Sequence, residues 1–174
     1  VELKLFSVDA PMPELTDELV RVLPKSEYVS GLIRENERGL QYTQGKLTRV
    51  LDPGQYALWS HPEARVEVRT VDMRRQQVTV AGQELMTRDK VTLRLTLTVE
   101  FVVEDPARAV EGASDVRDSV YLIVQLAARD YVAGVTLDEL LEGREAMTRY
   151  LEAEALPKAT GLGVRVERVG VKDV

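Results

Sequence analysis

The residue types that most often carry acid–base or metal chemistry are scarce in this chain. Among its 174 residues are one histidine, His61, and no cysteine. His61 precedes Pro62 in a predicted loop, and no serine or carboxylate lies at a spacing that would make it the base of a catalytic triad. A single histidine without cysteine also provides no metal-ligand cluster. We therefore interpret His61 as a surface residue.

A group of carboxylates in the last third of the chain suggests an acidic site at first sight. Its members are Asp138, Glu139, Glu142 and Glu145. They recur at helical spacing beside Arg144 and Arg149. Opposite charges three or four residues apart are typical of a solvated helix face, which is the interpretation we adopt.

Serines and glycines complete the list of residues that might take part in catalysis or bind phosphate. None of the serines lies in the glycine-flanked turn of a nucleophile elbow; they are Ser7, Ser26, Ser30, Ser60, Ser114 and Ser119. Gly161 and Gly163 lie between a predicted helix and a predicted strand, whereas a phosphate loop runs from strand to helix. The sequence therefore predicts a protein that is not an enzyme and needs no cofactor. An enzyme whose active site is not visible from sequence remains the weakest alternative.

Two aromatic residues raise the question of membrane contact. Tyr56 and Trp59 are amphipathic rings of the kind that is stable at a membrane interface. The alternative is that they pack against their own sheet near the turn at Asp52-Pro53-Gly54, and both interpretations stay open.

Composition and charge exclude several classes. Hydrophobic residues make up 44% and charged residues 30%, as expected for a globular domain. The net charge is −6 with scattered lysines and arginines, so we expect no nucleic-acid binding. No segment approaches the roughly 18–20 apolar residues that span a bilayer. Because the chain begins at Val1 rather than Met, we expect an excised segment whose membrane anchor lies outside it.

The clearest element is residues 91–103, where apolar residues occupy every second position, as in a strand with one buried face. Further strands are predicted over residues 28–33, 39–43, 47–51, 55–59 and 64–73, a hairpin over 76–88 turning at 81–82, and a closing strand over 164–171 with a bulge at 167–168. Helices are predicted over residues 14–23, 107–110, 115–132 and 136–158, the last opened by a capping box at Thr136. Residues 1–8 are strand-like.

This order predicts an α+β fold, with a mostly antiparallel sheet followed by two main helices and a closing strand. We divide the chain into an unassigned lead-in, residues 1–30, and one domain, residues 31–174.

Several motifs in this order resemble the stomatin/prohibitin/flotillin (SPFH, band 7) family, in particular prokaryotic stomatin-like proteins (slipins). They are residues 37–40 (Glu-Arg-Gly-Leu), 51–58 (Leu-Asp-Pro-Gly-Gln-Tyr-Ala-Leu), 71–74 (Val-Asp-Met-Arg), 84–92 (Glu-Leu-Met-Thr-Arg-Asp-Lys-Val-Thr), 103–106 (Val-Glu-Asp-Pro), 137–141 (Leu-Asp-Glu-Leu-Leu) and 169–174 (Val-Gly-Val-Lys-Asp-Val). Each motif alone is weak, whereas their order and spacing together are specific. Residues 1–30 have no counterpart in the family pattern.

The resemblance implies a non-enzymatic scaffold on the cytosolic face of a membrane, which homo-oligomerises to organise membrane microdomains and regulates channels or membrane-bound proteases. Its expected partners are copies of itself, membrane lipids through an outside anchor, and a client protease or channel. We expect weak self-association through strand edges, with Val169, Val171 and Val174 at the interface. The alternative is a soluble or peripheral module that docks a partner protease without self-assembly.

Overall fold

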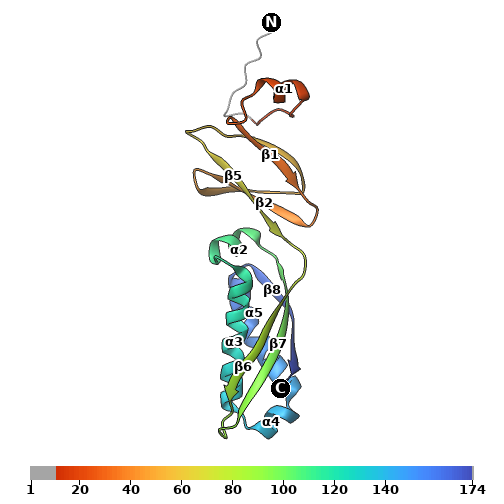
Figure 1. The fold of residues 1–174 in the computed structure, drawn as a ribbon, viewed down its shortest axis with the longest axis vertical. Coiled ribbons are helices and arrows are strands. Elements are labelled where there is room, and N and C mark those ends of the chain that lie inside the picture. Colours follow the sequence, from red (N-terminus) through yellow and green to blue (C-terminus); the bar gives the residue numbers. More distant parts are fainter. Residues whose placement is uncertain (1–10, 174) are drawn as a thin grey trace. The chain divides into compact units, whose positions relative to one another are not determined.

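The chain forms two compact units, Val1–Asp72 and Met73–Val174, in a computed structural model that describes residues 11–173 (Figure 1). The strand expected over residues 1–8 lies outside the described residues, as does Val174. Each unit is described by itself.

The first unit consists of a short helix and two small sheets. α1 (Asp17–Val22) begins after Thr16, whose hydroxyl accepts the Leu19 amide. β1 (Tyr28–Ile33) pairs with β4 (Gly54–Trp59), and β2 (Glu37–Thr43) lies between β3 (Lys46–Leu51) and β5 (Val66–Asp72), all antiparallel. The strands predicted here are confirmed, with small shifts at their ends. The buried hydrophobic side chains among the described residues of this unit are few: Ile33, Leu40, Leu51 and Val66.

The second unit is built on one antiparallel sheet. Its strand order is β6 (Gln76–Met86), β7 (Thr92–Val103), β8 (Val164–Asp173). The alternation predicted for residues 91–103 is confirmed from Leu95 onward: Leu95, Leu97, Val99, Phe101 and Val103 are buried, and the residues between them are at least partly exposed. Leu93 is only partly buried, and Val91 precedes the strand and is 37% exposed.

The hairpin predicted over residues 76–88 is wrong, because this segment is one continuous strand. Val80 lies opposite Leu97, whereas Gln83, three residues later, lies opposite Leu95, only two residues away. One extra residue in β6 is a β-bulge, and Gly82 supplies the positive φ of 62° that the bulge needs. The Ala-Gly pair therefore bends the strand without reversing the chain.

Helices cover one face of this sheet (Figure 1). The helices of this unit are α2 (Pro106–Gly112), α3 (Val116–Gly134), α4 (Leu137–Glu142) and α5 (Arg144–Gly161), and of these α3 and α5 pack on the sheet. The capping box at Thr136 is confirmed. However, the single helix expected over residues 136–158 is divided at Gly143, whose amide closes α4 on the Glu139 carbonyl and whose ψ of 34° is not helical.

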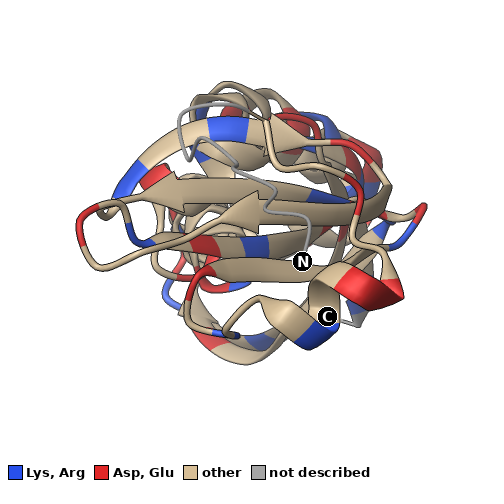
Figure 2. Cartoon of the chain, turned by 90° about the horizontal axis from the view of Figure 1, so that it is seen from above, with Lys and Arg blue, Asp and Glu red and all other residues tan. Residues whose placement is uncertain are grey.

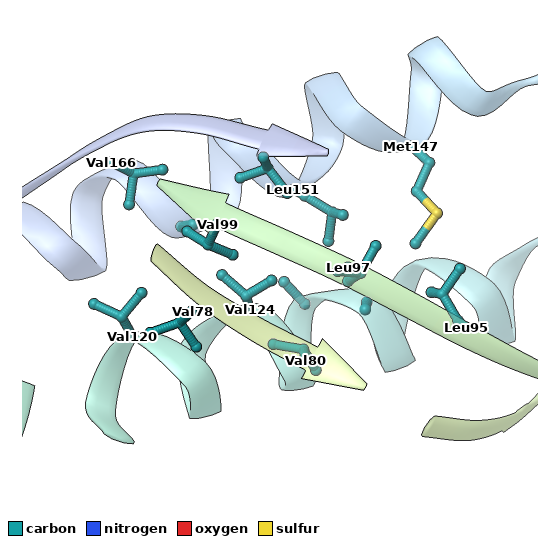
Figure 3. Close-up of a cluster of buried hydrophobic side chains, with 14 of the residues drawn as sticks. Val78, Val80, Leu95, Leu97, Val99, Val120, Val124, Met147, Leu151 and Val166 are labelled. Carbon is teal, nitrogen blue, oxygen red and sulfur yellow. The ribbon is translucent and has the colours of Figure 1, made fainter. Parts of the chain in front are cut away.

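The hydrophobic core of the second unit lies between the sheet and α3 and α5. Figure 3 shows Val80, Leu97 and Val99 of the sheet facing Val124 of α3 and Leu151 of α5. Two apolar residues of α3 lie outside this core: Leu122 and Leu126 are 52% and 49% exposed. These two residues lie on the side of α3 opposite its buried residues. The helix therefore has apolar residues on two sides but packs against the sheet with only one of them.

The link from α5 to β8 requires a glycine. Gly163 has a φ of +70°, and its carbonyl accepts the amides of Glu104 and Asp105. A Cβ at this position would lie 2.5 Å from the Asp105 carbonyl oxygen and 2.8 Å from the Arg108 Cβ. Close approach of two backbones therefore fixes how β8 enters the sheet. The bulge predicted at residues 167–168 of β8 is confirmed.

Candidate interaction surface

The residues with potential chemistry do not converge. His61 forms an isolated bridge with Ala64 in the first unit, and Asp138, Glu139, Glu142 and Glu145 are all exposed on α4 and α5. Within residues 11–173, no three His, Cys, Asp or Glu residues lie close enough to hold a metal ion. Figure 2 shows Lys and Arg positions interspersed with Asp and Glu positions along the ribbon.

The segment Thr87–Lys90, central to the family resemblance, has a structural role. The buried Thr87 hydroxyl donates to Asp89 at 2.5 Å and accepts the Val91 amide at 3.1 Å. Asp89 also accepts the Leu137 amide at 3.2 Å. The hydrogen bond from Thr87 holds the pKa of the Asp89 carboxyl below its usual value, with smaller contributions from backbone amides and from the charge of Arg88.

Arg88 extends this connection to the helices. Its guanidinium pairs with both carboxylate oxygens of Glu139, at 3.2 and 3.1 Å, and its amide donates to the Val135 carbonyl. The pKa of Glu139 is lowered mainly by the Thr136 amide of the capping box. The turn between β6 and β7 thus holds the connection between α3 and α4.

Tyr56 and Trp59 both lie on β4 and are partly buried. Tyr56 lies opposite Gly31 of β1, and a Cβ on that glycine would meet the Tyr56 ring at 2.8–3.1 Å, so the ring covers the glycine. Trp59 lies beside a hollow of about 220 Å³ that Pro11 and Met12 also line. Residues three apart on a strand point to opposite faces, so the two rings do not share a face. Membrane contact through either residue stays a prediction.

The surface with the features of a docking site is the outer edge of β8, which has a described strand only on its β7 side. Of the residues predicted at an interface, Val169 is buried in the core and Val171 is partly buried, and both lie on this edge strand. Two hollows flank it. One, of about 200 Å³ on the face away from the helices, is lined by Thr98, Glu100, Arg168, Gly170, Val171 and Lys172; the other, of about 460 Å³, lies between β8 and α5.

Three arginines line the hollow on the helix side: Arg144 and Arg149 from α5 and Arg168 from β8. Sequence reasoning assigned the first two to a solvated helix face and gave Arg168 no role beyond the bulge. No pattern in the sequence would have grouped them, because their proximity depends on how α5 packs against β8.

The opposite edge of the sheet is formed by β6. β6 carries the bulge at residues 81–82, and Arg117 of α3 donates to the Gln77 carbonyl at 3.0 Å. Gln83 hydrogen-bonds to Gln125 and Tyr121 of α3. Side chains of α3 thus contact β6 at Gln77 and Gln83, and the bulge interrupts this edge between them.

The described residues thus form an α+β fold, with antiparallel sheets, helices on one face of the second sheet and a closing strand. A family model confirms the resemblance: the SPFH domain / Band 7 family matches residues 32–174. The chain belongs to this family.

The chain is similar to stomatins and archaeal stomatin homologues. It is 31% identical to stomatin-like protein 3 of Mus musculus over 144 residues, 82% of this chain and 50% of the relative. It is 29% identical to a stomatin homologue of Pyrococcus horikoshii over 143 residues, 82% of this chain and 53% of the relative. The chain thus spans about half the length of the relatives it matches. Within the described residues no helix is long and apolar enough to cross a membrane.

Proposed function

We propose that this chain is the SPFH domain of a non-enzymatic, membrane-associated scaffold that self-assembles to organise membrane microdomains and to regulate membrane proteins such as channels or proteases. We further propose that the domain comprises residues 31–174, with residues 1–30 as a lead-in. Family membership supports the class, and the open β8 edge is the observation that supports assembly. Lipid contact would come from an anchor outside this chain on the cytosolic face, with Tyr56 and Trp59 as candidate membrane-facing residues.

Self-association through β8 is tested on this chain by multi-angle light scattering from micromolar to millimolar concentration. We expect the molar mass to rise above 19.5 kDa at the upper end. Val171→Lys should keep the protein monomeric, because a buried lysine at a paired edge costs more than the pairing contributes. Leu122→Lys, on the exposed side of α3, is the matched control and should behave as the wild type. A monomer at millimolar concentration would contradict this interface.

The scaffold itself is tested on the full-length protein. Mass measurement in detergent should give a large ring or cage. A full-length monomer that still binds a protease would instead identify the alternative, a regulatory module that docks a partner without self-assembly.

A further inference from the structure

We propose that the β8 edge docks an extended acidic segment of a partner protein as a fourth strand of the sheet. This inference rests on the same open edge as the proposed function but does not require self-association.

The length of the docking ladder follows from the register of β8. Arg168, Val169, Gly170 and Val171 pair regularly with Glu100, Val99, Thr98 and Leu97 of β7. Irregularities of one residue bound this run on both sides, at Glu167 and at Lys172. Since bulges interrupt pairing, an added strand fits only along these four residues, a length of about 13 Å.

The two hollows suit a strand in this position. Successive side chains of an added strand point to opposite faces of the sheet, so they would enter the two hollows in turn. The hollow away from the helices is lined by Thr98, Gly170 and Val171 and by three charged residues, Glu100, Arg168 and Lys172. Its volume of about 200 Å³ has room for a small side chain such as valine.

The hollow on the helix side favours a carboxylate. Arg144, Arg149 and Arg168 make no ion pair with any described side chain. Arg144 and Arg149 lie in this hollow with Glu145 and Glu152, and Arg168, which also lines the hollow on the other face, gives the lining an excess of one positive charge. Other arginines of this unit do pair with carboxylates; these include Arg75, Arg88, Arg94, Arg108 and Arg165. A guanidinium binds a carboxylate through two parallel hydrogen bonds, a geometry that lysine does not match.

A second copy of β8 fits this edge less well than an acidic strand does. It would bring another Arg168 and Lys172 to an edge that already carries both cations, and like charges on paired strands are destabilising. The self-association proposed above is expected to be weak for this reason. An acidic strand would bring no further cation to this edge and should compete with self-association.

The test uses a fluorescently labelled short peptide of alternating valine and glutamate, with anisotropy measured at a protein concentration where light scattering shows a monomer. We expect saturable binding that weakens as salt is raised, because exposed charge pairs are screened. The same peptide with lysine in place of glutamate should not bind. Arg149→Ala and Arg168→Ala should each weaken binding roughly threefold to tenfold. Arg129→Ala, on the exposed side of α3, should leave it unchanged.

Two further arms separate strand addition from simple charge attraction. Peptides N-methylated at alternate amides, in both phases, keep their charges but lose one row of backbone donors. At least one phase should lose binding, and undiminished binding of both phases would overturn strand addition. Equal binding of the lysine peptide, or no effect of the arginine substitutions, would overturn the acidic partner.

Two outcomes distinguish docking of an acidic strand from self-association and from binding to a membrane surface. Dimerisation at high concentration without peptide binding would leave self-association standing and refute the acidic partner. Arginine-dependent binding to vesicles of anionic lipid, without peptide binding, would reassign the hollow to a membrane surface and likewise overturn the proposal.

Discussion

Thr87 shows how a motif residue of this family acts through structure. Its side chain is 2% exposed and joins Asp89 and Val91, and Asp89 in turn accepts the Leu137 amide at the start of α4. A buried hydroxyl with good partners contributes to stability, and its removal leaves the Val91 amide without this acceptor. The sequence contains the motif, but its role depends on the contact between Asp89 and Leu137, which no local pattern indicates.

We predict that Thr87→Val lowers the free energy of unfolding at pH 7 by about 1–3 kcal/mol. The effect should depend on pH. Because the hydroxyl holds the pKa of Asp89 below its usual value, that contribution to stability is present above about pH 4, where the unfolded carboxyl is ionised, and is lost as pH falls through the folded pKa. Urea unfolding from pH 7 to pH 2.5 should show the wild type losing stability more steeply in acid than the variant. Thr79→Val, at an exposed position of β6, is the control and should change neither quantity.

At the scale of elements, a regular hydrophobic period predicted the strands correctly, whereas an interruption of the period did not show whether the chain turns or continues. The alternation along β7 and the bulge in β8 are visible in the residue pattern, since a slip in a two-residue period moves side chains to the other face. The Ala-Gly pair in β6 predicts a turn as readily as a bulge, because glycine with positive φ serves both equally well. Which one forms depends on whether β7 continues alongside, which is a tertiary property.

The division between α4 and α5 provides the prediction at this scale. A Cβ on Gly143 would lie 2.7 Å from the Glu139 carbonyl oxygen, the atom that accepts the Gly143 amide at 2.9 Å. Gly143→Ala should therefore destabilise the fold by about 1–3 kcal/mol and reduce hydrogen-exchange protection in α4 first. Gly134→Ala, with nothing within 4 Å of the added Cβ, should be neutral or stabilise by up to about 1 kcal/mol. Equal effects of the two substitutions would contradict this account of the helix break.

At the scale of the whole molecule, the fold class followed from the order of strands and helices, whereas the docking surface did not. Val169 and Val171 were placed at an edge because they close the chain's last strand. The hollow beside them is formed by Arg144 and Arg149 of α5 together with Arg168 of β8. The periodicity of a single segment cannot predict that these arginines lie close together, because their proximity depends on the packing of α5 against β8.

The two units differ in the size of their cores, which predicts two separable unfolding transitions. The described part of the first unit buries Ile33, Leu40, Leu51 and Val66, whereas the second has an extensive cluster around β7, α3 and α5. Because buried apolar area is the main source of stability, the first unit should unfold at lower denaturant. Each unit has its own probe. Trp59, the single tryptophan, lies in the first unit, and the long helices α3 and α5 dominate the far-ultraviolet circular dichroism of the second.

Leu40→Ala should shift only the fluorescence transition, by about 2–5 kcal/mol, and Phe101→Ala only the helical one, by about 3–5 kcal/mol. Both side chains are fully buried, so each substitution removes apolar contacts and leaves a cavity within its own unit. Guanidinium titrations of the two variants, followed by both probes in the same samples, measure the shifts. Coincident midpoints in the wild type, with each variant displacing both probes equally, would show one cooperative body and contradict the prediction. Separate transitions would mean that substitutions at the β8 edge can be studied without disturbing the unit that contains Tyr56 and Trp59.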